Sequence, residues 1–135
     1  MTGGDYMELI AKGADISKHN GNIDWNRVKK TEVNFVIIRA GFGFNTVDPM
    51  FETYIENAIK CGLDIGIYWF SYAGSVADAK KEAEFCLKTI LPYRKNINYP
   101  VFFDWENGSY NYVKRTYGIT PVSYTHLTLP TTPYV

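Results

Sequence analysis

The chain has 135 residues, 46% of them hydrophobic and 16% aromatic, and its 14 basic side chains balance 14 acidic ones. This length and apolar content suit one domain with a single core. Because the net charge is zero, it favours neither nucleic acid nor an anionic membrane as a partner, and we expect neither. No apolar stretch approaches the ~20 residues of a membrane span, and the first residues lack the pattern of an export signal.

The chain has few candidates for soft metal ligands. They are Cys61, Cys86, His19 and His126. These residues lack the paired Cys or Cys/His spacing of a zinc site, so we expect no metal ion, and we expect no cofactor. The two cysteines neither require nor exclude a disulfide, and His19 is interpreted as a loop residue.

The predicted elements alternate between strands and helices. In chain order they are a strand over residues 12–17, a short helix over 24–30, a strand over 34–40, a helix over 50–61, a strand over 63–70, a helix over 75–91 and a strand over 100–105. Asp24 and Gly62 stand where helix caps are expected, and Pro92 ends the third helix. This alternation is typical of a parallel sheet whose strands are connected by helices.

Polar residues recur at one position in this pattern, the carboxyl end of each predicted strand. They are Asp15, Arg39, Tyr68, Ser71, Asp104 and Glu106. Barrel enzymes place their chemistry at that rim because the loops there converge on one mouth. We therefore predict an α/β fold, an incomplete TIM-like β/α barrel with four βα units. An open doubly wound sheet remains the alternative, since its sites lie at the same strand ends.

Asp104-Trp105-Glu106 ends a strand that is otherwise apolar. Residues i and i+2 of a strand point the same way, so both carboxylates are expected on one face. Two carboxylates this close resist ionising together, which raises the pKa of one and makes it a general acid. Glycoside cleavage needs this division of roles. The alternative is a strand that becomes polar where it meets solvent.

A third carboxylate, Asp15, follows the first apolar strand, and the curvature of a closing barrel would bring it toward the fourth strand. Its alternative role is in the turn at Asn20-Gly21. Arg39 has an alternative role as the partner that neutralises one of these acids. Three acids at one rim favour the catalytic interpretation of Asp15, Asp104 and Glu106.

Five blocks of the sequence resemble the glycoside hydrolase family 25 muramidases. They are Asp15-Ile-Ser-Lys-His-Asn20-Gly21, Ile23-Asp24-Trp25, Phe35-Val-Ile-Ile-Arg39-Ala-Gly41, Gly66-Ile-Tyr68-Trp-Phe70-Ser71 and Pro100-Val-Phe-Phe-Asp104-Trp-Glu106. The resemblance covers residues 11–116. It implies a modified barrel that cleaves the β-1,4 bond between N-acetylmuramic acid and N-acetylglucosamine in peptidoglycan.

The resemblance also implies roles for single residues. Glu106 corresponds to the proton donor, Asp104 and Asp15 complete the site, and Tyr68 lies in the cleft. We expect the glycan to contact the side chains of four residues, Tyr68, Arg39, Phe70 and Trp105. We favour a retaining mechanism in which the acetamido oxygen of the substrate attacks the anomeric carbon and Asp104 orients it. The rival interpretations are a catalytically inactive peptidoglycan-binding relative and an unrelated barrel enzyme.

The domain organisation is expected to have three parts: an extension over residues 1–10, a partial muramidase domain over 11–120, and a tail over 121–135. The stretch Val122-Ser-Tyr-Thr-His-Leu-Thr-Leu-Pro-Thr matches the translation of a transposon-end adapter used in DNA library preparation. We therefore expect the tail to be non-native and the domain to be C-terminally truncated. The expected partner is the peptidoglycan glycan strand, with the complete domain a monomer that acts on the cell wall, extracellularly or after release by a phage.

Overall fold

The structure is a computed structural model that describes residues 11–117, so the expected extension and the expected tail lie outside it. The elements are β1 (Gly13–Ile16), the 3-10 helix η2 (Lys18–Asn20), α1 (Trp25–Val28), β2 (Phe35–Phe42), β3 (Thr46–Val47), α2 (Phe51–Lys60), β4 (Asp64–Phe70), α3 (Val76–Ile90), the 3-10 helix η3 (Leu91–Asn96), β5 (Val101–Asp104) and α4 (Asn107–Tyr117). All four strands and three helices that the sequence predicts are present. No helix among the described residues is long and apolar enough to cross a membrane.

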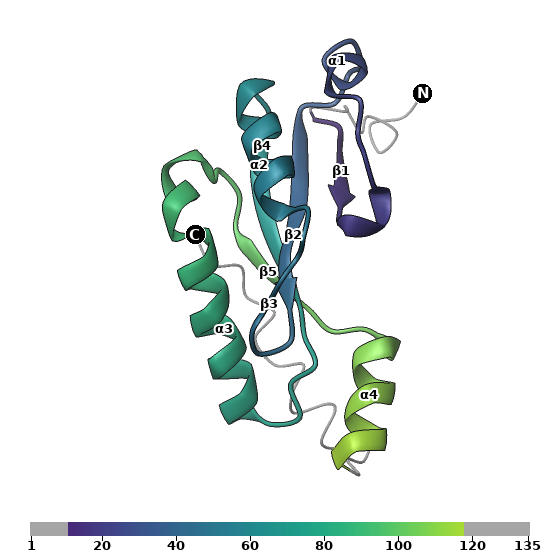
Figure 1. The fold of residues 1–135 in the computed structure, drawn as a ribbon, viewed down its shortest axis with the longest axis vertical. Coiled ribbons are helices and arrows are strands. Elements are labelled where there is room, and N and C mark those ends of the chain that lie inside the picture. Colours follow the sequence, from purple (N-terminus) through teal and green to yellow (C-terminus); the bar gives the residue numbers. More distant parts are fainter. Residues whose placement is uncertain (1–10, 118–135) are drawn as a thin grey trace, which may run out of the picture.

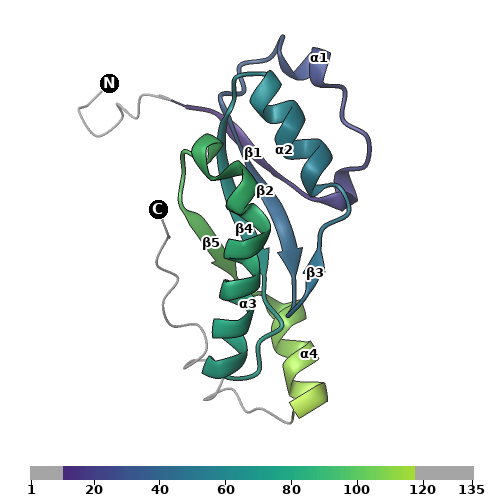
Figure 2. The ribbon, with the colours of Figure 1, turned by 60° about the vertical axis from the view of Figure 1, so that its left-hand side comes forward.

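The four main strands form one parallel sheet in the order β1-β2-β4-β5, and the short β3 pairs antiparallel with the end of β2 (Figure 1). Each parallel strand is followed by a helix, so the chain contains four βα units in sequential order. Both α2 and α3 lie on the same side of the sheet (Figure 2). Sequential strands with helices on one face are the arrangement of a barrel wall, and the prediction of an incomplete β/α barrel is confirmed.

The core lies between the sheet and the two long helices. Alternate residues of β2 and β4 point toward α2 and α3, which supply the other half of the core. The buried members are Ile16, Val36, Ile38, Ala40, Phe51, Tyr54, Ile55, Ala58, Ile65, Ile67, Trp69, Cys86, Ile90 and Val101. Since successive residues of a strand point to opposite faces, the residues between these ones face the other side of the sheet.

That second face of the sheet is open among the described residues. Asp15 is exposed, Ile37 and Tyr68 are half-buried, and Phe102 is 38% exposed. The sequence predicts Asp15 and Tyr68 at strand ends, and the structure shows that both face this open side. In a barrel wall this is the inner face, which is where the carboxylates are found.

Apart from the two 3-10 helices, two elements were not predicted from the sequence. The first, β3, is only two residues long, too short for a pattern. It folds back because Gly43 adopts a left-handed φ of 66°, and because a Cβ at Gly41 would lie 2.2 Å from the carbonyl oxygen of Thr46. The second, α4, begins with Asn107-Gly108-Ser109, a composition typical of a turn.

Candidate active site

Three of the predicted catalytic carboxylates meet in one hollow at the carboxyl ends of the strands. Asp15 belongs to β1, Asp104 ends β5, and Glu106 follows two residues later. The hollow has a volume of about 450 Å³ and is lined by Asp15, Ser17, Asn20, Ile37, Tyr68, Phe102, Phe103, Asp104 and Glu106. The structure thus brings together residues from opposite edges of the described sheet, which the sequence alone could only place at one rim.

Strand register explains why these side chains share the inner face. Asp15 pairs with Ile37 of β2, and Tyr68 of β4 pairs with Phe102 of β5. Asp104 lies two residues beyond Phe102 and therefore points to the same face. The period of two along each strand places one acid at the end of β1 and another at the end of β5, with Tyr68 between them.

The carboxyl groups of Asp104 and Glu106 are joined by a hydrogen bond. The pKa of Asp104 is raised to about 7, chiefly by burial and then by the hydrogen bond to Glu106 and the negative charges of Glu106 and Asp15. Asp104 is half-buried while Glu106 is exposed at the edge of the hollow. The pair can therefore hold one proton near neutral pH, as the sequence predicts, but the raised pKa belongs to Asp104.

The backbone around this pair is anchored on both sides. The Ser71 N–H donates a 2.8 Å hydrogen bond to the carbonyl oxygen of Asp104. The Glu106 N–H donates to Oγ of Ser109 at 3.2 Å, and the Glu106 carbonyl accepts from the Tyr110 N–H at 2.9 Å. Glu106 therefore directly precedes α4, and its backbone is fixed to the first turn of that helix.

Tyr68, from β4, lines the hollow. Its hydroxyl is hydrogen-bonded to the side chain of Ser17. The negative charges of Asp15 and Asp104 act to raise the pKa of this hydroxyl. Burial raises the pKa of Tyr68, an effect that the nearby Arg39 guanidinium partly offsets. Tyr68 thus remains a neutral phenol that contacts the β1 loop and lies close to both aspartates.

Three predicted substrate contacts do not line the hollow: Arg39, Phe70 and Trp105. Nε of Arg39 donates to Oδ2 of Asp48 at 2.8 Å, so its partner is a fourth acid. The guanidinium carbon also lies 4.8 Å from the centre of the Phe42 ring. Phe70 packs against Tyr72, with ring centres 5.2 Å apart. Contact of these three residues with a glycan stays a prediction.

Asp48 is one of two buried acids that the sequence analysis did not single out, and it is only 1% exposed. Beyond Arg39, its carboxylate accepts hydrogen bonds from the N–H groups of Lys18 at 3.0 Å and Met50 at 2.9 Å. It thereby connects the loop after β1, strand β2 and the start of α2. Asp48-Pro49 before a helix was the available signal, because Asp is a frequent cap.

Glu82 is the second buried acid, with no exposed surface. Its carboxylate accepts hydrogen bonds from the Ser71 hydroxyl at 2.6 Å and the Tyr72 N–H at 2.9 Å. Burial raises the pKa of Glu82, although both hydrogen bonds oppose the shift. Helical spacing within α3 made Glu82 look like one of its solvent-facing charges, so no sequence signal marked it.

The sequence analysis also missed two polar residues of the hollow, Ser17 and Asn20. Asn20 Oδ1 accepts from the Ser17 N–H at 2.9 Å, and Ser17 Oγ accepts from the His19 N–H at 3.3 Å. This reciprocal capping holds the 3-10 turn beside Asp15. The spacing of Ser17 and Asn20 resembles a capping box and could have identified the turn.

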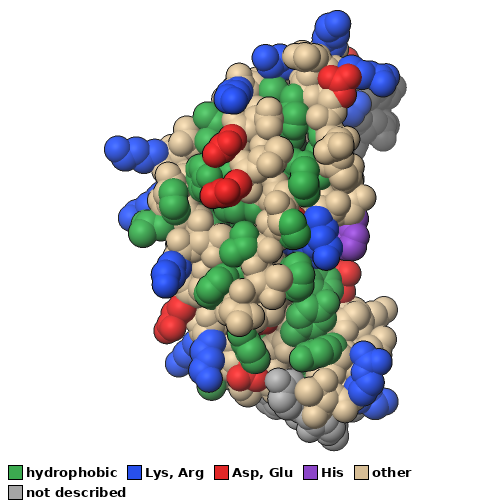
Figure 3. Space-filling view, in the orientation of Figure 1, with side chains coloured by type: hydrophobic (Ala, Val, Ile, Leu, Met, Phe, Trp, Pro, Cys, Tyr) green, Lys and Arg blue, Asp and Glu red, His purple; other side chains and the backbone are tan. Residues whose placement is uncertain are grey.

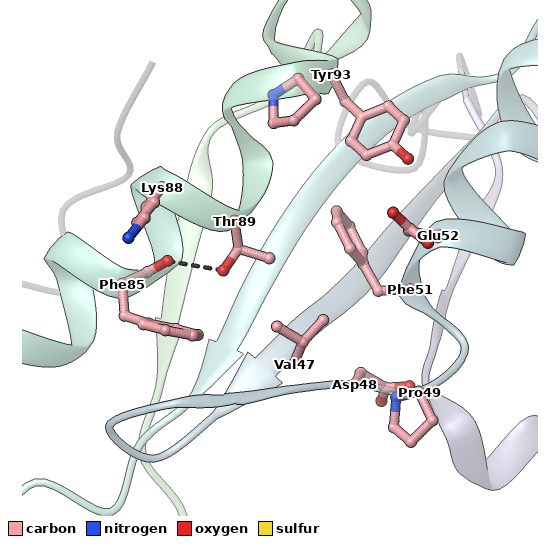
Figure 4. A pocket seen from close by; sticks show the side chains of 10 residues that line it. Val47, Asp48, Pro49, Phe51, Glu52, Phe85, Lys88, Thr89 and Tyr93 are labelled. Atoms are coloured by element: carbon pink, nitrogen blue, oxygen red, sulfur yellow. Dashed lines mark hydrogen bonds between the residues drawn. The ribbon is translucent and has the colours of Figure 1, made fainter.

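A second cavity, of about 430 Å³, lies on the helix-covered side between β3, the start of α2 and the end of α3 (Figure 4). Phe51, Phe85 and Tyr93 supply aromatic walls, while Glu52 and Lys88 lie at its margins. None of the three catalytic candidates reaches it. Among residues 11–117, no group of three or more His, Cys, Asp or Glu side chains is placed to hold a metal ion.

The β/α wall and the acidic hollow at its strand ends are together typical of a β/α-barrel hydrolase. Residues 14–129 match the family described as Glycosyl hydrolases family 25, and the chain belongs to that family. The matched range reaches into the segment expected to be non-native, so the domain boundary at residue 120 stays a prediction.

Known relatives agree with this assignment. The chain is 35% identical over 79 residues to an autolytic lysozyme of Clostridium acetobutylicum, covering 58% of this chain and 24% of the relative. It also resembles the modular autolysin LytC of Streptococcus pneumoniae in complex with a synthetic peptidoglycan ligand. That match has 34% identity and a TM-score of 0.65, and it covers 70% of this chain and 22% of LytC. The chain thus spans about a quarter of the length of these relatives.

A third similarity concerns the fold alone. The catalytic domain of endolysin ply40 from bacteriophage P40 of Listeria monocytogenes shares 22% identity with the chain at a TM-score of 0.64. The match covers 79% of this chain and 59% of that domain. The βα wall described above is therefore shared with both a bacterial and a phage protein.

Proposed function

We propose that the protein is a peptidoglycan hydrolase that cleaves the β-1,4 bond between N-acetylmuramic acid and N-acetylglucosamine. The observation that carries the proposal is the hydrogen-bonded pair of Asp104 and Glu106, which shares one hollow with Asp15. Membership of glycosyl hydrolases family 25 and the similarity to LytC, whose structure holds a synthetic peptidoglycan ligand, support it. The action would be on the cell wall, after secretion or release by a phage.

In this mechanism Glu106 is the proton donor. Glu106 is exposed and lines the hollow, where it can reach a glycosidic oxygen, while Asp104 is half-buried. The proton held by Asp104 passes across their hydrogen bond to Glu106, and Glu106 transfers it to the leaving oxygen as the bond to the anomeric carbon breaks. Asp104 is then left as a carboxylate that can stabilise positive charge on the sugar.

The short separation of the pair bears on stereochemistry. An inverting pair needs a gap of about 6.5–9.5 Å for a water molecule, and two carboxyl groups that share a hydrogen bond leave no such gap. A retaining route suits this arrangement, with the acetamido oxygen of the substrate attacking the anomeric carbon. Asp104 would orient that acetamido group, and Asp15 and Tyr68 would contact the sugar from the side of β1 and β4.

The test is the release of reducing ends from purified peptidoglycan by the parent chain and by Glu106→Gln, measured from pH 4 to 9. Loss of the proton donor is expected to lower the rate by roughly 10²–10⁴-fold. Parent activity should fall as the pH rises through about 7, because the pair then loses its proton. A Glu106→Gln variant that is as active as the parent would refute the proposal. A folded parent that binds peptidoglycan without cleaving it would instead be an inactive relative.

A further inference from the structure

The loop that follows β4 begins at Ser71 and leads into α3. Because it has no regular secondary structure, its N–H groups need partners outside the helix and strand ladders. The N–H of Tyr72 donates to Glu82 at 2.9 Å, that of Gly74 to Asp78 at 3.2 Å, and that of Ser71 to the carbonyl of Asp104 at 2.8 Å. The loop therefore connects two acids of α3 with the strand end that carries the candidate catalytic pair.

Glu82 binds this loop with both of its carboxylate oxygens. Oε1 accepts a hydrogen bond from the Ser71 hydroxyl at 2.6 Å, and Oε2 accepts from the Tyr72 N–H at 2.9 Å. Ser71 and Glu82 have no exposed surface, so water cannot take the place of either contact. The Ser71 hydroxyl oxygen also accepts from the Ala73 N–H at 3.0 Å. One side chain thus orders three successive residues of the loop.

The position of Asp104 depends on this loop because β5 is a short strand. Within residues 11–117, β5 has 4 residues and pairs with β4 alone. Asp104 is its last residue and lies opposite Phe70 in the ladder. The bond from the Ser71 N–H to the Asp104 carbonyl follows this last pair. It therefore fixes the piece of backbone that carries the Asp104 carboxyl group.

The surroundings of Glu82 differ from those of other charged residues of α3. Lys80, Lys81 and Glu84 are exposed, and Figure 3 shows acidic and basic side chains close together on the surface over α3. Burial raises the pKa of Glu82, its two hydrogen bonds oppose the shift, and the negative charge of Asp78 adds to it. Burying a carboxyl group without a cation is costly, so the place of Glu82 in α3 is better explained by the loop that it binds than by the stability of the helix.

We propose that Glu82 is a positioning residue of the candidate active site, which holds the loop after β4 and thereby sets the position of Asp104 relative to Glu106. The proposal rests on the proposed function, since an effect on the rate requires that this pair transfers a proton. Glu82 does not line the hollow, so it acts through the backbone of Ser71 and not on the substrate.

Loss of the Glu82 carboxyl group is expected to loosen the site in a defined direction. The Tyr72 N–H and the Ser71 hydroxyl lose a buried acceptor, so the loop shifts toward other partners. Asp104 then gains contact with solvent, and its hydrogen bond to Glu106 weakens. Because burial and the interaction with Glu106 are what raise the pKa of Asp104 to about 7, that pKa should fall toward its ordinary range.

The first experiment measures kcat and KM on soluble, uncross-linked peptidoglycan strands from pH 4 to 9, with each variant folded under the assay conditions. Glu82→Ala is expected to lower kcat by about 10–100-fold and to leave KM nearly unchanged, because a displacement of about 1 Å can cost 10²-fold in rate. Its activity should also be lost at a lower pH than that of the parent. Glu82→Gln should keep most of the rate, since its amide oxygen accepts from the Tyr72 N–H and its NH₂ group can donate to the Ser71 hydroxyl oxygen.

The matched control is Glu84→Ala, because Glu84 is exposed on the same helix. A purely structural role of Glu82 would change the folded fraction but neither the kcat of the folded chain nor its pH profile. Equal kcat and pH profiles in the parent and Glu82→Ala therefore overturn the proposal, and so does an equal loss in Glu84→Ala or Glu82→Gln. If Glu82→Ala does not fold, Ser71→Ala replaces it, because this change removes the 2.6 Å contact and should shift kcat and the pH profile in the same direction.

The second experiment needs no substrate, so it separates this proposal from the proposed function. The carboxyl ¹³C NMR signal of Asp104, assigned with Asp104→Asn, is followed from pH 4 to 9. The other titratable groups that face Asp104 are Glu106, Asp15 of β1 and Tyr68 of β4, and they are the same in every chain compared. The titration midpoint should be lower in Glu82→Ala than in the parent and unchanged in Glu82→Gln.

The comparison of the two Glu82 variants isolates the contacts from the charge, because both variants remove the same carboxylate. A lower midpoint in Glu82→Ala alone supports the positioning of Asp104 even if the parent cleaves nothing, in which case only the proposed function fails. Equal midpoints in the parent and Glu82→Ala, or an equal fall in both variants, overturn the positioning role.

Discussion

Asp48, in the loop before α2, and Glu82, in α3, are both buried carboxylates, yet their surroundings differ. Asp48 accepts from the Arg39 guanidinium and from two backbone N–H groups. Glu82 accepts from one hydroxyl and one N–H, and among residues 11–117 no cation forms an ion pair with it. Burial raises the pKa of Glu82. The two acids thus differ in what offsets the cost of burial: a cation with backbone hydrogen bonds for Asp48, and hydrogen bonds alone for Glu82.

The two acids support opposite sides of the hollow. Asp48 binds the backbone of Lys18, next to Ser17 and the β1 loop that carries Asp15. Glu82 binds Ser71 and Tyr72, and the Ser71 N–H in turn holds the carbonyl of Asp104. One side of the site is thus held by an ion pair, and the other by a carboxyl group that protonates more readily.

Arg39→Met should give the largest effect of the changes that test this comparison. It leaves the Asp48 carboxylate buried without its cation, which is expected to lower the free energy of unfolding by about 3–5 kcal/mol. Chemical denaturation at pH 7 measures the change. In the double variant Arg39→Met/Asp48→Asn the buried charge is gone, so much of the loss should be recovered. A loss below about 1 kcal/mol in the single variant would show that the ion pair is not what stabilises Asp48.

Glu82→Ala should come next, with a loss of about 2–3 kcal/mol. It leaves the Tyr72 N–H and the Ser71 hydroxyl without their acceptor in a buried loop and removes packed side-chain atoms. The same denaturation experiment measures it, with Glu84→Ala as the matched control, since Glu84 is exposed on the same helix. Equal losses in both variants would contradict a specific role of Glu82.

Glu82→Gln should have the smallest effect, within about 1 kcal/mol at pH 7, but it should change the pH dependence. The raised pKa means that the folded chain binds a proton at Glu82 more readily than the unfolded chain. Its ionisation therefore destabilises the fold, with no penalty below the unfolded-state pKa and the full penalty above the folded-state pKa.

The measurement for Glu82→Gln is the free energy of unfolding from pH 4 to 9 for the variant and the parent. Stability of the parent should fall relative to the variant as the pH rises through the folded-state pKa of Glu82. Asp104 also titrates in this range, in the same direction, but it is present in both chains and cancels in the difference. Parallel pH curves would contradict this prediction, because they would mean that the pKa of Glu82 is the same in the folded and the unfolded chain.

Much of the fold was predictable because its signals are local. The β-branched run of β2, the cap at Asp24 and the glycine after α2 act within a few residues of themselves, and each marks an element that the structure contains. Two elements, β3 and α4, lacked a local sequence signal. β3 forms because Gly41 and Gly43 let the chain turn back on β2, and α4 begins with residues that have a turn composition.

The features of the candidate active site likewise separate into those that local sequence signals predict and those that depend on tertiary contacts. The sequence by itself determined the four βα units, the position of Asp15, Asp104 and Glu106 at strand ends, and the expectation that one carboxyl of the close pair has a raised pKa. These follow from periodicity along a strand and from the adjacency of Asp104 and Glu106, which any extended backbone preserves.

Only the tertiary structure decided which carboxyl has the raised pKa, which acid pairs with Arg39, and that Glu82 is buried. Each depends on the packing of segments that are separate in the chain: burial and the charge of Asp15 raise the pKa of Asp104, and the loop at Asp48 returns to β2. Tyr72 and Tyr112 likewise meet only because α4 lies beside the loop after β4. Desolvation and charge pairing act through space, so a pattern read along the chain does not contain them.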